Sequence, residues 1–182
     1  MKYVALLRGI NVGGRNMIKM ETLRATFAAL GFENVVSYIN SGNLIFDCKR
    51  PLVSKGVSLD TKLAVKIHDA IQTDFGFDIS VMVRPMAEIA EIVANNPFNG
   101  QFENDKDVHV FFLKNELTDE QKCLLSAQGN ENEKFAVFSR HVFCLLKISI
   151  LDSAVGKGFI DKKLKVATTA RNWRTVKKIV EM

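Results

Sequence analysis

The stretch VVSYINSGNLIFD, residues 35–47, decides the fold of this chain. Residues with high strand propensity fill both ends of the stretch, and the polar segment Asn40–Asn43 separates them. This pattern predicts a β-hairpin whose turn lies near Asn40–Asn43, with Gly42 supplying the freedom that a tight turn needs.

Helical and strand segments on either side of the hairpin complete a six-element pattern. Tyr3–Leu7 predicts a first strand. Apolar residues repeat with helical spacing over 20–30 and 59–75, and a glycine follows each stripe. Residues 79–83 predict the next strand. The order β-α-β-β-α-β is ferredoxin-like, an antiparallel sheet with helices on one face, and indicates the α+β class.

The element order begins again after a polar, turn-rich segment at 95–107. We therefore predict two related ferredoxin-like halves, the first at 1–97 and the second at 105–182. The second half contains a predicted strand, a helix, a second hairpin and a further helical segment, but no clear last strand. We expect its tail to be a basic amphipathic helix that starts after Thr168 or Thr169, since either residue can cap a helix.

The composition is that of a globular protein, with 47% hydrophobic and 25% charged residues. No apolar run approaches the roughly 20 residues of a membrane helix, and the first apolar run ends at Arg8 without a cleavage site. The three cysteines are dispersed and odd in number, so we expect no disulfide framework, no metal site and a cytoplasmic location. No cofactor is indicated.

The net charge of +5 is unevenly distributed. Residues 153–182 contain eight basic and two acidic side chains, so this segment carries 8 − 2 = +6 and the rest of the chain −1. A localised basic segment favours an anionic partner. The alternative is an ordinary solvated helix face.

Several stretches resemble one known family. They are YVALLRGINVGGRN at 3–16, the helix ending in LGF at 30–32, YINSGNLIF at 38–46 and TTARNWRTVKKI at 168–179. Together they resemble the bacterial family called domain of unknown function 1697, from the first strand to the last helix. The resemblance implies a compact, soluble bacterial protein of two ferredoxin-like halves, and it carries no activity, substrate or cofactor.

The segment between the first strand and the first helix is long and glycine-rich. Its glycines allow a ligand to approach the backbone, whose N–H groups can bind an anion near a helix start. The candidate anion ligands are Arg8, Gly9, Asn11, Gly13, Gly14, Arg15 and Lys19. The segment matches neither the dinucleotide-binding fingerprint nor the P-loop. The alternative is that its glycines only shape a wide turn.

The tail supplies a second set of candidates. Placed on one helical wheel, Trp173 falls on an apolar face and Arg171 and Arg174 on a basic face, while Asn172 lies on the apolar side and needs a partner. Arg171 and Asn172 join the predicted anion site. The weaker nucleic-acid hypothesis uses base stacking on aromatic side chains and phosphate contacts, and its residues are Tyr38, Trp173, Arg174 and Lys178. We expect the Asn40–Asn43 turn to lie at the opposite end of the sheet from Arg8.

Three functions remain open, and no catalytic residue stands out. The first is binding of a phosphate-bearing ligand, a nucleotide or single-stranded nucleic acid, although the RNP1 pattern is absent. The second is a small enzyme that holds an anionic metabolite between the halves with Arg8, Asn11, Arg171 and Asn172. The third is a structural or interaction protein in which the glycine-rich segment is scaffold.

Overall fold

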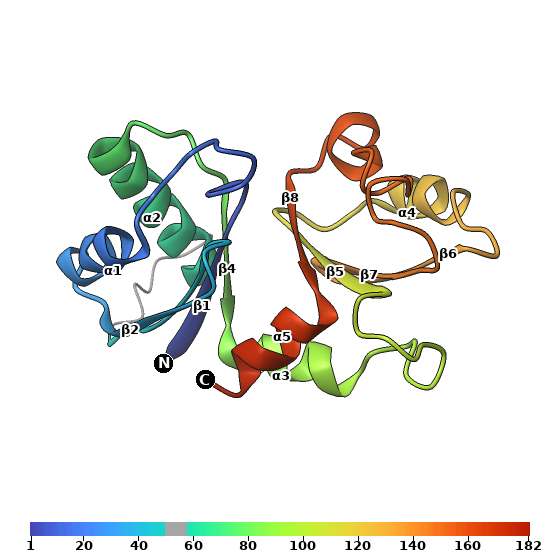
Figure 1. The fold of residues 1–182 in the computed structure, drawn as a ribbon, viewed down its shortest axis with the longest axis horizontal. Coiled ribbons are helices and arrows are strands. Elements are labelled where there is room, and N and C mark those ends of the chain that lie inside the picture. The colour runs from blue at the N-terminus through green and yellow to red at the C-terminus, as the bar shows by residue number, and fades with distance from the viewer. Residues whose placement is uncertain (50–57) are drawn as a thin grey trace. The chain divides into compact units, whose positions relative to one another are not determined.

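The computed structural model describes residues 1–49 and 58–182, which form two compact units (Figure 1). Unit 1 comprises Met1–Glu91 and Ile179–Met182, and unit 2 comprises Ile92–Lys178. Each unit contains a four-stranded antiparallel sheet with helices packed on it. The predicted α+β class and the two similar halves are therefore confirmed.

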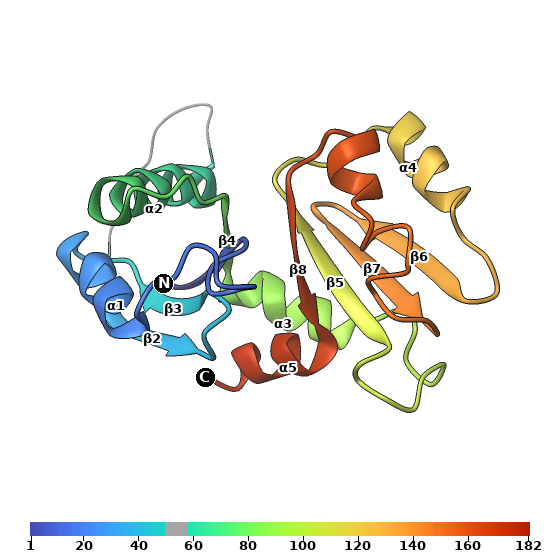
Figure 2. The ribbon, with the colours of Figure 1, turned by 45° about the horizontal axis from the view of Figure 1, so that its top comes forward.

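Unit 1 has the predicted ferredoxin-like sheet, with strand order β2-β3-β1-β4. Helices α1 and α2 cover one face of this sheet (Figure 2). A further helix, α3, follows β4 directly and runs from unit 1 into unit 2. The elements are β1 (Lys2–Leu7), α1 (Met20–Ala29), β2 (Glu33–Tyr38), β3 (Asn43–Asp47), α2 (Leu59–Phe75), β4 (Val81–Pro85) and α3 (Met86–Ala94).

Unit 2 repeats the same topology, with strand order β6-β7-β5-β8. A short π-helix, η1, replaces the second helix of the ferredoxin-like pattern. The elements are β5 (Val108–Leu113), α4 (Asp119–Ser126), β6 (Glu133–Phe138), β7 (His141–Leu146), η1 (Phe159–Lys163), β8 (Thr168–Asn172) and α5 (Trp173–Val180).

The core of unit 1 forms where the two helices meet the sheet. Leu23 and Phe27 of α1 and Leu63 and Ile67 of α2 are buried with almost no exposed surface, as their helical spacing predicts. Phe46 of β3 packs against Phe27, with ring centroids 5.6 Å apart. Burial of each such side chain contributes roughly 1.5–3 kcal/mol, so this face of the sheet holds the unit together.

The ends of the unit 1 helices follow from glycines in the left-handed region. Gly76 has φ 72° directly after α2, and its N–H donates to the Gln72 carbonyl. Gly31 has φ 82° one residue after the cap of α1. Only glycine adopts this conformation without a Cβ penalty, so both helices end close to where the sequence predicts.

Unit 2 has a core of its own on the helix-covered face. Phe111, Val142 and Cys144 of the sheet pack with Leu125 of α4 and Ile160 of η1. Burial raises the pKa of the Cys144 thiol well above its usual value. The thiol therefore stays protonated and serves as a small core residue.

The tail of the chain corrects one sequence prediction. Thr168–Asn172 is the last strand, β8, and pairs antiparallel with β5 from Leu113–Thr168 to His109–Asn172. The expected helix start after Thr168 or Thr169 is therefore wrong. Helix α5 begins at Trp173 because Asn172 caps it, with the Asn172 Oδ1 accepting from the Thr175 N–H at 2.9 Å.

The position of the β2–β3 turn corrects a second prediction. β3 runs antiparallel to β1, and the register pairs Leu6 with Asn43. The Leu7 N–H donates to the Gly42 carbonyl at 2.8 Å. The turn therefore lies beside the C-terminal end of β1 and next to Arg8, not at the opposite end of the sheet.

Backbone hydrogen bonds make the two units equivalent at this end of the sheet. The Leu113 N–H donates to the Arg140 carbonyl in the β6–β7 turn, as the Leu7 N–H does to Gly42. The N–H of the next residue donates to the segment before the last strand in both units, as Arg8 to Ser80 at 3.0 Å and Lys114 to Ala167 at 2.9 Å. The structure thus gives a residue-level correspondence between the halves.

Candidate anion-binding site

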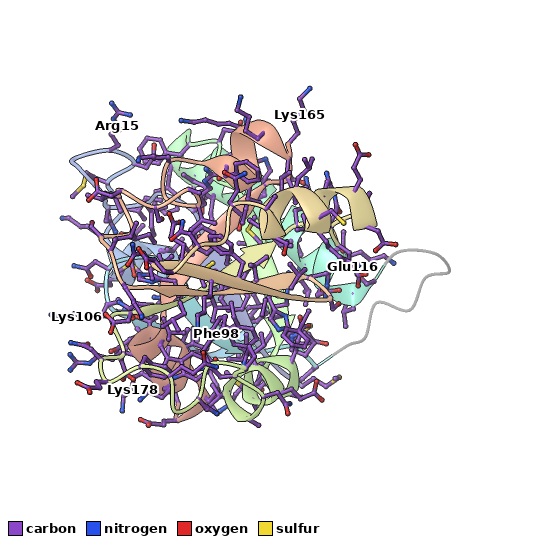
Figure 3. The ribbon with its side chains drawn as sticks, turned by 90° about the vertical axis from the view of Figure 1, so that its right-hand side faces the viewer. Arg15, Phe98, Lys106, Glu116, Lys165 and Lys178 are labelled. Atoms are coloured by element: carbon purple, nitrogen blue, oxygen red, sulfur yellow. The ribbon has the colours of Figure 1, made fainter. Side chains whose placement is uncertain are left out.

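The first-strand connection, Arg8–Lys19, is the candidate site and is called the glycine loop below. It carries three exposed cationic side chains, Arg8, Arg15 and Lys19. Figure 3 shows Arg15 projecting outward from the loop. The first 20 residues of the chain contain four basic side chains and no acidic one. This part of unit 1 therefore presents positive charge without a carboxylate from its own segment.

A tight turn forms the tip of the glycine loop. The Arg15 N–H donates to the Val12 carbonyl at 3.1 Å, and these two residues form an isolated β-bridge. Gly13 and Gly14, the central residues, have φ values of 58° and 73°. Two successive positive φ values identify a type I′ turn, which favours glycine at both central positions. A Cβ at either position would meet nothing within 4 Å, so backbone conformation and not packing requires these glycines.

Asn11 fixes the base of the glycine loop. Its side-chain Nδ2 donates to the Asn40 carbonyl at 2.9 Å and to the Ile18 carbonyl at 3.0 Å, and its Oδ1 accepts from the Ile18 N–H at 2.8 Å. Asn16 adds a bond from its Nδ2 to the Gly9 carbonyl at 3.1 Å. Asn11 and Asn16 both have positive φ, which asparagine tolerates better than other non-glycine residues. The loop therefore has a defined shape, and the Asn11 amide serves that shape.

The start of α1 adds a weaker feature to the same loop. Lys19 occupies the N-cap position with extended backbone, and no side chain caps the helix there by a hydrogen bond. The first N–H groups of a helix carry partial positive charge, which favours a nearby anion. By contrast, Thr118 and Gln121 form a capping box at the start of the equivalent helix α4.

The equivalent connection in unit 2 shows what the fold itself requires. Five residues, 114–118, join β5 to α4, whereas twelve, 8–19, join β1 to α1. The short connection contains no glycine and includes Glu116. The same topology therefore forms without the glycine loop, which is an elaboration of unit 1.

The predicted residues of the tail take other positions. Arg171 lies on β8 and is buried, and its Nη1 donates to the Thr169 Oγ1 and the Ala170 carbonyl at 2.9 and 2.8 Å. Burial lowers the pKa of its guanidinium to about 10, so it remains charged at neutral pH. Asn172 caps α5, and Trp173 is buried against Phe143 with ring centroids 6.2 Å apart.

One of the basic side chains of α5 forms an ion pair. Lys177 forms an ion pair with Asp105, with its Nζ 2.7 Å from a carboxylate oxygen. Arg174 and Lys178 are exposed on the helix. Tyr38, the remaining candidate, is half-buried at the end of β2, and its carbonyl accepts from the Asn43 side chain.

The structure groups the predicted residues by unit. Seven of them share the glycine loop, and Tyr38 lies at the end of β2 in the same unit. Arg171, Asn172, Trp173, Arg174 and Lys178 belong to unit 2, so a site shared between the two groups stays a prediction. Sequence analysis missed Asn16 and Asn40. Asparagine at the ends of a glycine-rich turn was the available signal for them.

Two classes of site receive no support from the described residues. Within 1–49 and 58–182, no group of three or more histidine, cysteine, aspartate or glutamate side chains is arranged to hold a metal ion. The helices of the same residues are too short or too polar to span a bilayer.

Comparison with known proteins places the chain in a family. The model of the family described as protein of unknown function DUF1697 matches residues 1–143, which include the glycine loop and the whole hairpin at 35–47. The chain belongs to this family. No curated protein matches it.

A solved structure shares the fold of the family member described here. It is that of the conserved bacterial protein SP0830 from Streptococcus pneumoniae, which is 25% identical in sequence and superposes with a TM-score of 0.73. The alignment covers 99% of this chain and 97% of that chain. The two-unit architecture is therefore common to both proteins.

Proposed function

We propose that this DUF1697 protein binds a phosphate-bearing ligand, a nucleotide or single-stranded nucleic acid, through the glycine loop. The main support is the difference between the two equivalent connections. Unit 2 joins its first strand to its first helix with 5 residues, and unit 1 uses 12 that include three glycines and three cations. Long loops on a rigid scaffold are a common location of binding sites.

The chemistry of the loop suits a phosphate group. The guanidinium of Arg15 offers paired N–H donors that match phosphate oxygens, and Lys19 adds a charge at the start of α1. Open space around Gly13 and Gly14 allows a ligand to approach their backbone. The bonds from Asn11 hold the loop in shape before binding, which reduces the entropy that a ligand must overcome.

The exposed cations of α5 extend the proposal to a polymeric ligand. Arg174 and Lys178 of unit 2 would bind phosphates of such a polymer independently of the glycine loop. Arg171 is left out of this extension because its side chain is buried.

Calorimetric titration of the purified chain tests the proposal. The titrants are inorganic phosphate, ATP and a ten-nucleotide single strand, each at 50 and 200 mM salt. We expect saturable binding of ATP or the oligonucleotide and a loss of about tenfold or more in Arg15→Ala, because a charge-assisted contact is worth about 1.5–3 kcal/mol. Lys106→Ala is the matched control, since it removes one exposed positive charge from unit 2.

The outcomes separate the open functions. Steep salt dependence for the oligonucleotide would indicate a polymer, and weak dependence with tight ATP binding would indicate a small metabolite. If Arg15→Ala binds every titrant with the same affinity as Lys106→Ala, the glycine loop has no part in binding and the proposal is wrong.

A further inference from the structure

An exposed aromatic side chain at the end of β6 has no role in the core of unit 2. Phe138 is 47% exposed, although it ends a strand whose Phe135 and Val137 pack against the helix-covered core. Strand side chains alternate between faces, so Phe138 lies with Lys134 and Ala136 on the face opposite α4 and η1, where Phe143 and Leu145 of β7 are buried. Leaving about half of a phenylalanine exposed forgoes part of the roughly 1.5–3 kcal/mol that full burial contributes.

The ring of Phe138 is held in place by other aromatic rings. It stacks on His141 with centroids 6.1 Å apart and planes 20° apart, and it meets Phe143 edge-to-face at 5.8 Å. Phe143 is buried and continues the array to Trp173 at 6.2 Å. One side of the Phe138 ring therefore rests on a fixed aromatic base while the residue stays open to solvent.

Charged side chains lie on the strands and turn near this ring. Exposed Lys134 lies on the same face of β6 as Phe138, four residues earlier, and its Nζ donates to the Gln101 Oε1 at 3.1 Å. The Leu113–Arg140 backbone bond brings the end of β5, and so exposed Lys114, to the β6–β7 turn. An acidic group, Glu116, also lies nearby, and its Oε1 accepts from the Ser139 hydroxyl at 2.7 Å. Lys114 and Lys134 thus carry two positive charges on these segments, against one negative charge from Glu116.

The correspondence between the units puts Tyr38 in the same place in unit 1. Tyr38 ends β2 and pairs with Asn43, the first residue of β3, as Phe138 ends β6 and pairs with His141, the first residue of β7. Both units therefore carry an aromatic side chain at the same end of the sheet, beside the connection that follows their first strand.

We propose that Phe138 is a stacking platform for a nucleobase, with Lys114 and Lys134 as contacts for the attached phosphates. Aromatic side chains on sheets of this topology bind unpaired bases by stacking, and neighbouring cations bind the backbone. This site consists of unit 2 residues alone, so it goes beyond the glycine loop and does not depend on phosphate binding there.

Fluorescence anisotropy of a labelled ten-nucleotide thymidine strand tests the platform. Phe138→Leu keeps an apolar side chain and removes the ring, and we expect it to weaken binding about fivefold or more, as loss of one stacked base implies. Phe138→Tyr keeps the ring and should bind like the unaltered chain. Leu124→Ser, which alters another exposed apolar residue of unit 2, is the control.

Two competitors identify the ligand chemistry. Inorganic polyphosphate of matched length has the charge without bases, and we expect its affinity to be the same in Phe138→Leu and in the unaltered chain. Thymidine monophosphate is the second competitor. Displacement of the labelled strand by it would indicate a mononucleotide site, and no displacement would indicate a site that needs a strand. Unchanged oligonucleotide binding in Phe138→Leu would overturn the proposal. So would an equal loss for oligonucleotide and polyphosphate, or no oligonucleotide binding at 50 mM salt. Arg15→Ala alters the glycine loop. When it is combined with each Phe138 variant, we expect the ratio of the oligonucleotide affinities of Phe138→Tyr and Phe138→Leu to stay unchanged.

Discussion

The side-chain amide of Asn11 donates to the backbone carbonyl of Asn40 at 2.9 Å and ties the glycine loop to the β2–β3 turn. These residues are 29 positions apart in the chain, and both flank glycine-containing turns. The bond joins two of the segments that carry the family resemblance, LLRGINVGGRN and YINSGN. Its removal should therefore affect the shape of the loop and the stability of unit 1 together.

Replacing Asn11 by glycine should destabilise unit 1 more than replacing Asn16. Asn11→Gly removes three side-chain hydrogen bonds, at a net cost of about 0.5–1.5 kcal/mol each, so we expect a loss of about 2 kcal/mol in the free energy of unfolding. Asn16→Gly removes one bond at a similar positive φ and should cost about 1 kcal/mol or less. Urea denaturation followed by circular dichroism measures both. Equal losses would show that Asn11 does not hold the loop.

Gly42 should tolerate a side chain less well than Gly31. Both residues have φ near 80°, but a Cβ at Gly42 would lie 2.7 Å from the Leu7 Cβ, whereas one at Gly31 would meet nothing within 4 Å. We expect Gly31→Ala to cost about 1–2 kcal/mol from backbone strain alone and Gly42→Ala about 2–4 kcal/mol, because overpacking adds to the strain. Thermal unfolding of the two variants compares them directly. A smaller decrease in melting temperature for Gly42→Ala than for Gly31→Ala would contradict the close approach of the turn to β1.

Stability should fall when the solution is acidified below about pH 6.5, in part because of His109. Desolvation lowers the pKa of its imidazole, more than the nearby Asp107 raises it, and its Nδ1 is buried without a hydrogen-bond partner among the described residues. The unfolded chain binds this proton more readily, with a pKa near 6.5. The stability contributed by neutral His109 is therefore present above that pH and is lost as the pH falls through the folded-state pKa.

Denaturation at pH 8, 6.5 and 5, followed by the fluorescence of Trp173 in unit 2, measures this effect. His109→Gln cannot titrate in this range and should show a smaller loss between pH 8 and pH 5. His68, which is 31% exposed and lies 3.8 Å from Asp78, provides the comparison variant His68→Gln. If both histidine variants keep the full pH dependence, another group is responsible.

Removing the cap of α5 should destabilise the tail. Asn172→Ala loses the bond to the Thr175 N–H, and loss of an N-cap costs about 1 kcal/mol. Asn172→Asp retains an acceptor and should keep most of the stability. Amide exchange of Thr175 reports the cap itself. Unchanged exchange in Asn172→Ala would mean that the cap does not protect the helix.

The sequence by itself determined the elements whose causes are local. Helix α2 follows from apolar residues at helical spacing and a glycine after Phe75, and its observed bounds match the prediction. The hairpin at 35–47 follows from two apolar runs around a glycine-containing turn. The repeated element order likewise predicted two halves, because the order of elements restricts which strands can pair.

Tertiary structure decided the features that depend on distant partners. Thr168–Asn172 becomes a strand because β5, far earlier in the chain, offers it an edge, and that pairing turns Arg171 inward and makes Asn172 a cap. The β2–β3 turn lies beside Arg8 because β3 runs antiparallel to β1. The helical wheel of the tail does not contain the pairing between β5 and β8. Such pairing joins strands that are distant in the sequence, and it depends on cross-strand packing and burial more than on local propensity.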